Sequence, residues 1–280
     1  MNNLLKRTLT GIIFLVVMVF GIIWDRNLFA ALFLLILVVA VREFYTMSLG
    51  RNFVIQQKMG LLAGALLFIS SVILNFWNVD AKWLNACELS AFALLLLIPV
   101  TCIFRSSHED HGNLAYIYAG LLYIALPVSL YPFLVMDGEV FDGWMFLSMF
   151  IIIWVSDVGA YCIGSMLGQR EGAKKLAPLI SPKKSWWGFW GAVVLGTGAA
   201  VGLHYLTWLP FPLVHCIAVG VIISVMGVCG DLVESLWKRY FHVKDSGNCI
   251  PGHGGMLDRF DSSLIAIPAA AIYLYFFNLI

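Results

Sequence analysis

Residues 8–24 read TLTGIIFLVVMVFGIIW, a run of seventeen residues without a charged side chain that directly follows Lys6 and Arg7. A helix of about 17 to 25 apolar residues is long enough to cross the hydrocarbon core of a bilayer. Basic residues before an apolar run also open a secretory signal peptide. Here, however, no small-x-small cleavage site closes the run, and more apolar runs follow. We therefore expect a retained first transmembrane helix.

Similar runs recur along the 280 residues, which are 61% hydrophobic and only 12% charged. Soluble domains carry roughly twice that charged fraction. We therefore expect an all-α polytopic membrane protein, with residues 1–280 forming a single integral membrane domain. The apolar runs predict about nine transmembrane helices, at 8–24, 28–41, 59–76, 89–104, 114–135, 144–161, 190–208, 212–229 and 262–280.

The basic residues predict which side of the membrane each loop faces. With a cytoplasmic N-terminus, the predicted cytoplasmic loops hold fifteen of the seventeen lysines and arginines, all except Arg26 and Lys82. The C-terminus then faces outward. The two longest cytoplasmic segments, roughly 162–189 and 230–261, are rich in Gly, Pro, Lys and Ser, so we expect the chemistry to lie there.

The first chemistry-bearing stretch is GDLVESLWKR, residues 230–239. If the eighth span continues as a helix, Asp231, Glu234, Ser235 and Lys238 share one face. This pattern favours a ligand site. The alternative is a salt-bridged helix end whose long side chains reach out of the membrane.

The second stretch is KDSGNCIPGHGGMLDRFD, residues 244–261. Its glycines, among them Gly254 and Gly255, allow the backbone to approach a phosphate closely. Asp258 and Asp261 are three residues apart where the last helix begins, so both can face one site that suits Mg²⁺. The alternative for these two carboxylates is simple complementarity with the helix dipole.

Two further features border these stretches. Asp157 lies in WVSDVGAY (154–161) near the cytoplasmic end of the sixth span, where a carboxylate is costly unless it is paired or coordinated. It belongs either to the site or to a polar contact between helices. Ser181 and Lys184, in KKLAPLISPKKSWWGFW (174–190), indicate a binding loop; a positive-inside anchor is the alternative.

Together these residues resemble the signature of phosphatidate cytidylyltransferases. The resemblance is closest over 154–261, and its core spans 27 residues at fixed spacing. That core comprises Ser235, Lys238, Arg239, Lys244, Asp245, Gly247, Ile250, Pro251, His253, Gly254, Gly255, Asp258, Arg259 and Asp261.

The resemblance implies an enzyme that converts CTP and phosphatidic acid into CDP-diacylglycerol and pyrophosphate with Mg²⁺, the number of metal ions being open. It also implies a homodimer. The metal ligands expected from it are Asp231, Asp258 and Asp261, with Asp157 and Glu234 as further candidates. The residues expected to contact the phosphates or the substrates are Lys238, Arg239, Lys244, Arg259, Ser181, Lys184, Ser235, His253, Gly254 and Gly255.

These expectations place a multi-pass enzyme in the inner (plasma) membrane, with its site at the cytoplasmic boundary, where CTP meets the lipid headgroup. No nucleic-acid partner is expected. One alternative enzyme is a CTP-dependent lipid or polyprenol kinase, which would transfer the γ-phosphate instead. An alternative of a different class is an ion-coupled transporter, although such proteins place coupling carboxylates near the bilayer midplane.

Overall fold

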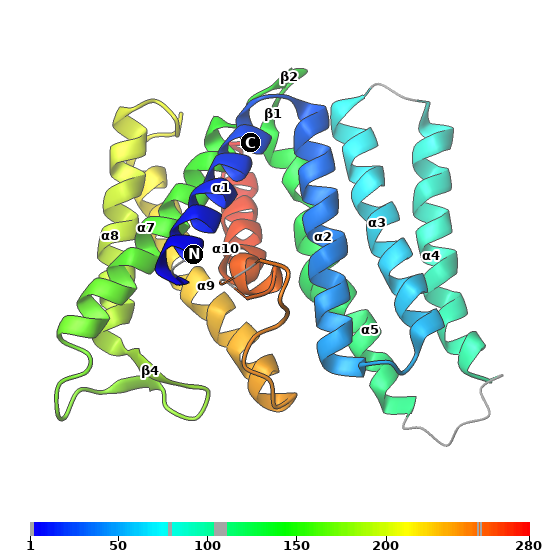
Figure 1. Ribbon diagram of the computed structural model, residues 1–280. Coiled ribbons are helices and arrows are strands. Elements are labelled where there is room, and N and C mark those ends of the chain that lie inside the picture. Colours follow the sequence, from blue (N-terminus) through cyan, green and yellow to red (C-terminus); the bar gives the residue numbers. More distant parts are fainter. Residues whose placement is uncertain (1–2, 78–79, 104–110, 251, 253) are drawn as a thin grey trace. The chain divides into compact units, whose positions relative to one another are not determined.

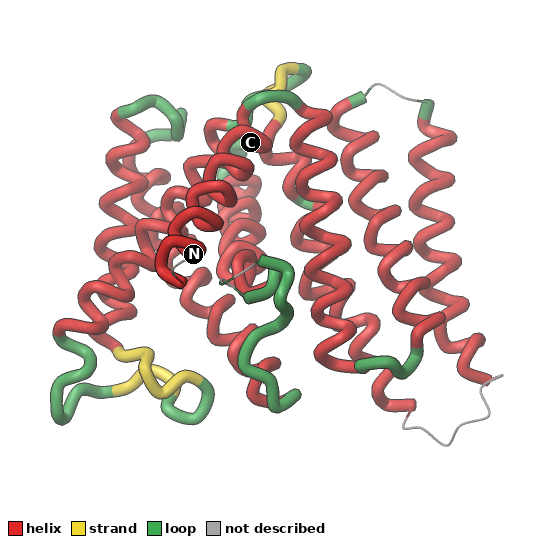
Figure 2. The backbone as a smooth tube through the Cα atoms, in the orientation of Figure 1, coloured by secondary structure: helices red, strands yellow, loops and turns green. Residues whose placement is uncertain are grey.

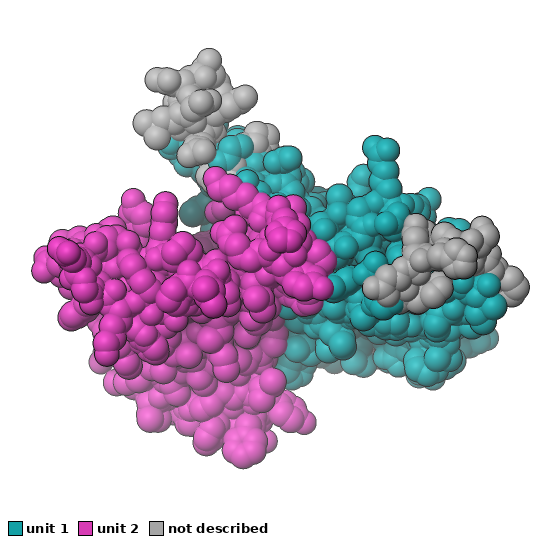
Figure 3. All heavy atoms as spheres, turned by 90° about the horizontal axis from the view of Figure 1, so that it is seen from below, with its two compact units in different colours: residues 1–141, 245–258 teal, residues 142–244, 259–280 magenta. Residues whose placement is uncertain are grey.

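The computed structural model describes residues 3–77, 80–103, 111–250, 252 and 254–280, and these are predominantly α-helical (Figure 1, Figure 2). The chain divides into two compact units, Met1–Phe141 with Asp245–Asp258, and Asp142–Lys244 with Arg259–Ile280 (Figure 3). Both units are built from apolar helices. The division into two units does not test the expectation of a single integral membrane domain, which stays a prediction.

The first unit contains four long helices: α1 (Asn3–Ile23), α2 (Arg26–Leu49), α3 (Val54–Phe76) and α4 (Ala81–Ile103). The helix α3 packs against both α2 and α4, and the three run side by side in Figure 1. The start of α2 is fixed by Asp25, whose Oδ2 accepts hydrogen bonds from the backbone N–H groups of Asn27 and Leu28. Such a cap satisfies N–H groups that have no partner within the helix.

The fifth predicted span is an irregular helix. It contains η1 (His111–Leu114), α5 (Ala115–Gly120), the π-helical turn η2 (Leu121–Ala125), α6 (Leu126–Ser129) and the 3₁₀ turn η3 (Tyr131–Val135). The turn η2 directly precedes α6, which holds Pro127, and η3 holds Pro132. Since proline has no N–H to donate, regular α-helical bonding cannot continue through these positions. The short strands β1 (Met136–Asp137) and β2 (Val140–Phe141) then pair antiparallel.

The second unit is built around α7 (Trp144–Met166), α8 (Trp186–Tyr205), α9 (Leu213–Tyr240) and α10 (Leu257–Phe276). The segment predicted as a binding loop between α7 and α8 is an antiparallel hairpin of β3 (Lys175–Ala177) and β4 (Ser181–Ser185). Ser185 ends the hairpin and caps α8, because its Oγ accepts a hydrogen bond from Gly188 N at 3.2 Å. The hairpin is therefore attached directly to the start of a long helix.

Glycines bring α7 and α8 close together. A Cβ added at Gly159 would lie 3.0 Å from Leu195 Cβ, and one at Gly164 would lie 3.3 Å from Gly188 Cα. These two glycines therefore permit the close approach of α7 and α8. Packing of small residues is the usual basis of helix association in a membrane.

Seven helical segments in the described part of the chain are long and apolar enough to cross a membrane: α2, α3, α4, Gly112–Val135, α7, α8 and α9. Each of the nine predicted spans overlaps a helix. However, α1 contributes only the shorter apolar part Thr8–Ile23, and α10 begins with three charged residues in its first five. The finding supports an all-α polytopic membrane protein, whereas the number nine and the side of the N-terminus stay predictions.

Candidate active site

The helix α9 continues well beyond its apolar part, to Tyr240. Asp231, Glu234, Ser235 and Lys238 therefore share one helical face, as the sequence predicted. Ser235 Oγ donates a hydrogen bond to Asp231 Oδ1 at 3.3 Å, and Lys238 forms an ion pair with Glu234. Both contacts join residues four apart, which is the spacing at which helical side chains meet.

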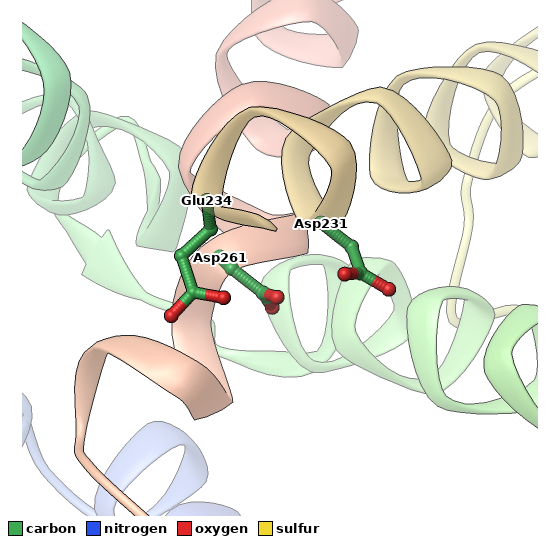
Figure 4. A group of neighbouring side chains, drawn as sticks. All are labelled: Asp231, Glu234 and Asp261. Carbon is green, nitrogen blue, oxygen red and sulfur yellow. The ribbon is translucent and has the colours of Figure 1, made fainter. Parts of the chain in front are cut away.

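Asp261 of α10 joins two of these α9 residues in an acidic cluster. One carboxylate oxygen each from Asp231, Glu234 and Asp261 lies within 4.8 Å of the others. Figure 4 shows Asp261 between Glu234 and Asp231. The helices come this close because α9 has a glycine there: a Cβ at Gly230 would lie 3.0 Å from Ser262 Cα. We use the name acidic cluster for these three carboxylates.

The three carboxylates of the acidic cluster repel one another when they are ionised, unless positive charge lies nearby. Glu234 is fully buried, and Asp261 keeps only partial exposure to solvent. Burial among protein atoms and, next, the negative charge of Asp231 together raise the pKa of Asp261 to about 8, against a lowering contribution from Lys238. Crowded carboxylates of this kind stay ionised only when cations compensate them.

Two lysines supply part of that compensation. Lys184 Nζ, from strand β4, lies 2.6 Å from Asp231 Oδ2, and Lys238 pairs with Glu234 within α9. The hairpin thus delivers a predicted site residue to the acidic cluster. Asp157 of α7 lies within electrostatic range of Asp231, Lys184 and Arg259. The second unit therefore brings together most of the charged residues predicted for the site.

Other predicted residues of this unit lie nearer to solvent. Arg239 is exposed and donates through Nε to Ile180 O at 3.2 Å, next to Ser181 at the start of β4. Lys244 and Arg259 are exposed as well, which leaves their charges available to a soluble or interfacial phosphate.

The glycine-rich segment of the first unit forms a separate arrangement around Asp258. The Oδ2 atom of Asp258 accepts hydrogen bonds from Ser246 N at 3.0 Å, Ser246 Oγ at 2.9 Å and Gly255 N at 2.8 Å. Gly254 has a φ of 85°, which favours glycine, and forms an isolated bridge with Ile250. His253 lies outside the described residues.

These contacts refine two expectations about the segment. Asp261 belongs to the acidic cluster, whereas Asp258 accepts hydrogen bonds from Ser246 and Gly255 and so connects the two; its role as a metal ligand stays a prediction. Gly255 N–H, expected to face a phosphate, here donates to the Asp258 carboxylate instead.

One charged residue at this segment was not predicted from the sequence. Glu43 of α2 accepts a hydrogen bond at Oε2 from Leu257 N at 2.9 Å. Glu43 lies just after the predicted span 28–41, next to Arg42 in a predicted cytoplasmic loop, where a charged side chain is ordinary. No local signal in the sequence therefore marked it.

Comparison with known proteins identifies the family of the chain. The sequence model of the Cytidylyltransferase family matches residues 5–277. A phosphatidate cytidylyltransferase of Bacillus subtilis is 32% identical over 279 residues, covering 99% of this chain and 98% of its own length. Proteins of the same name from Staphylococcus epidermidis and Staphylococcus aureus are each 30% identical, over 276 and 270 residues, covering 96% of this chain and 98% of their own lengths. The chain therefore belongs to the cytidylyltransferase family.

Proposed function

We infer that this chain is a CTP:phosphatidate cytidylyltransferase, a nucleotidyltransferase of phospholipid biosynthesis that forms CDP-diacylglycerol and pyrophosphate. The family match and the names of the relatives support this inference over nearly the whole chain. The apolar helices suit a lipid substrate that never leaves the membrane.

The observation that carries the assignment of the site is the acidic cluster with its two lysines. Three carboxylate oxygens within 4.8 Å of one another are the hard ligands that Mg²⁺ prefers, and the cluster leaves coordination positions for phosphate oxygens. Asp231, Glu234 and Asp261 would hold the ion. When bound, Mg²⁺ supplies positive charge next to the triphosphate.

The remaining residues then bind and orient the substrates. Lys184, Lys238, Arg239 and Arg259 offer positive charge to the triphosphate of CTP and to the phosphate of the lipid. A Lys184 that already contacts Asp231 is held in place, so it binds a phosphate with little further loss of side-chain freedom. Asp157 would keep these cations oriented through its charge.

The reaction itself needs no strong base. The second pKa of a phosphate monoester is about 6, so the lipid phosphate is largely dianionic at neutral pH. Its oxygen forms a bond to the α-phosphorus of CTP while the bond from that phosphorus to the β-phosphate oxygen breaks. Pyrophosphate leaves with the electron pair. The chain therefore contributes positioning and charge neutralisation.

The distribution of basic residues supports the proposed location. Fifteen of seventeen lysines and arginines fall on the cytoplasmic side if the N-terminus is cytoplasmic and nine spans cross the membrane. We place the site at the cytoplasmic boundary of the plasma membrane, since CTP is too polar to enter the bilayer core. We propose a homodimer from the family resemblance alone.

The experiment that tests this function uses purified protein in mixed micelles with phosphatidic acid, Mg²⁺ and CTP labelled at either the α or the γ position. We expect the α-label to enter the lipid and the γ-label to appear in pyrophosphate. Transfer of the γ-label to lipid would show a kinase. No transfer of either label would contradict both enzyme assignments and lead to ion-transport assays.

A further inference from the structure

The carboxylate of Glu43 reaches a segment that lies more than two hundred residues away in the sequence. Its Oε2 atom accepts a hydrogen bond from Leu257 N at 2.9 Å, and Ser246 Oγ lies 3.3 Å from the same oxygen. Leu257 is the first residue of α10. Glu43 thus places a negative charge at a helix N-terminus, where the backbone dipole favours it.

Ser246 connects Glu43 with Asp258. Its hydroxyl lies 2.9 Å from Asp258 Oδ2 and 3.3 Å from Glu43 Oε2, and it has one hydrogen to donate. The backbone N–H of Ser246 also donates to Asp258, at 3.0 Å. Two carboxylates from distant parts of the sequence are therefore joined through one residue of the glycine-rich segment.

The glycines at this point make room for the Glu43 side chain. A Cβ at Gly247 would lie 2.6 Å from Glu43 Cδ, and a Cβ at Gly255 would lie 2.5 Å from Glu43 Oε2 and 2.7 Å from Gly247 N. Real Cβ atoms do not come this close to other heavy atoms. Two glycines of the signature are thus required here by the packing of Glu43.

Capping one helix N–H does not require a carboxylate inside an apolar helix. A neutral oxygen of Ser, Thr or Asn caps a helix about as well. What a carboxylate adds is a strong acceptor for both Ser246 and Leu257, which lie near the two ends of the glycine-rich segment in the sequence.

We propose that Glu43 is a positioning residue for cytidylyl transfer: it fixes the segment 245–257 and the first turn of α10, so that Asp258 and the glycine backbone stand ready for the substrate phosphates. The proposal rests on the proposed function and on the family resemblance, which assigns Asp258 and the glycines of this segment to the substrate site. Glu43 acts through Ser246 and Leu257 and need not touch the substrate itself.

The test compares Glu43→Gln and Glu43→Ala with Glu88→Gln and Glu88→Ala. Glu88 is an exposed carboxylate on α4 of the same unit, so its variants control for the loss of one charge. Turnover is measured per folded molecule with both substrates saturating, and KM is measured for CTP and for phosphatidic acid. Backbone amide exchange of 245–257 is followed by mass spectrometry without substrate.

We expect kcat to fall about 10- to 100-fold in Glu43→Ala, as for other residues that orient a catalytic group. Glu43→Gln should keep more activity, because its amide oxygen still accepts from Leu257 N. Exchange should accelerate at 245–257 in both Glu43 variants and in neither Glu88 variant.

Wild-type turnover per folded molecule in Glu43→Ala, or unchanged exchange at 245–257, would overturn the proposal. If Glu43→Ala does not fold, the same two criteria apply to Glu43→Gln. Amide exchange needs no substrate, so it tests the anchoring even if the wild-type protein fails to make CDP-diacylglycerol. That failure would count against the proposed function alone.

Discussion

Lys184 on strand β4 contacts Asp231 on helix α9, with 2.6 Å between Nζ and Oδ2. The contact ties the β3–β4 hairpin to the acidic cluster, although the two residues are far apart in the sequence. A lysine held by a carboxylate is oriented before any substrate arrives. We therefore propose that the hairpin has a specific role in binding phosphate, beyond the general attraction of basic loops to the cytoplasmic side.

The matched pair Lys184→Met and Lys183→Met tests this role. Lys183 is the exposed neighbour of Lys184 on the same strand. We expect Lys184→Met to lower kcat/KM for CTP by about 10- to 100-fold, since a hydrogen bond to a charged group contributes roughly 1.5–3 kcal/mol. Lys183→Met should stay within about twofold of wild type. The measurement is steady-state formation of CDP-diacylglycerol. Equal losses of kcat/KM in both variants would show that Lys184 contributes only general positive charge.

Variants of the ion pair between Glu234 and Lys238 are expected to affect protein stability and catalytic activity differently. Glu234→Gln removes the ion pair between Glu234 and the largely buried Lys238, so we expect the unfolding free energy in detergent to fall by about 3 kcal/mol. The double variant Glu234→Gln/Lys238→Met should regain much of that stability but none of the activity, because a proposed metal ligand and a proposed phosphate contact are both missing. Glu171→Gln, on an exposed turn of the same unit, is the control. Activity recovered in the double variant would show that the pair has only a structural role.

Close packing of α7 and α8 predicts a third result. A Cβ at Gly191 would lie 2.7 Å from Gly159 O and 2.8 Å from Ile163 Cβ, whereas a Cβ at Gly198 on the same helix meets nothing within 4 Å. We expect Gly191→Ala to destabilise the protein by roughly 1–3 kcal/mol through overpacking. Gly198→Ala should be neutral or slightly stabilising, because alanine favours a helix over glycine. Thermal unfolding in detergent provides the comparison, and similar midpoints for the two variants would argue against tight packing at Gly191.

The sequence was informative wherever the chemistry lay on one continuous helix. Helical spacing alone put Asp231, Glu234, Ser235 and Lys238 on one face, and the structure confirms that α9 continues through them. This prediction succeeds because the geometry of a helix is local and repeats every 3.6 residues. The expectation that Asp258 and Asp261 both face one site stays a prediction, although Asp261 lies in the acidic cluster.

Contacts between distant segments were harder to predict. Ser181 and Lys184 were expected in a loop, but pairing of β3 with β4 depends on partners that no local pattern reveals. The sequence pattern made Asp258 and Asp261 equivalent, yet Asp258 accepts hydrogen bonds from Ser246 and Gly255. Glu43 was missed because its partner Leu257 lies 214 residues further along the chain.

The central claim is that the acidic cluster binds the divalent cation used in cytidylyl transfer. The most direct measurement is electron paramagnetic resonance of Mn²⁺ bound to the protein in the presence of α,β-methylene-CTP, a CTP analogue that cannot release pyrophosphate. Wild type is compared with Asp261→Asn and with Asp80→Asn. Asp80 is an exposed carboxylate that is not part of the acidic cluster, so its variant controls for the loss of one negative charge. We predict that Asp261→Asn weakens Mn²⁺ binding at least about tenfold, while Asp80→Asn binds as wild type does. Equal Mn²⁺ affinity in wild type and Asp261→Asn would contradict the assignment of the cluster as the metal site.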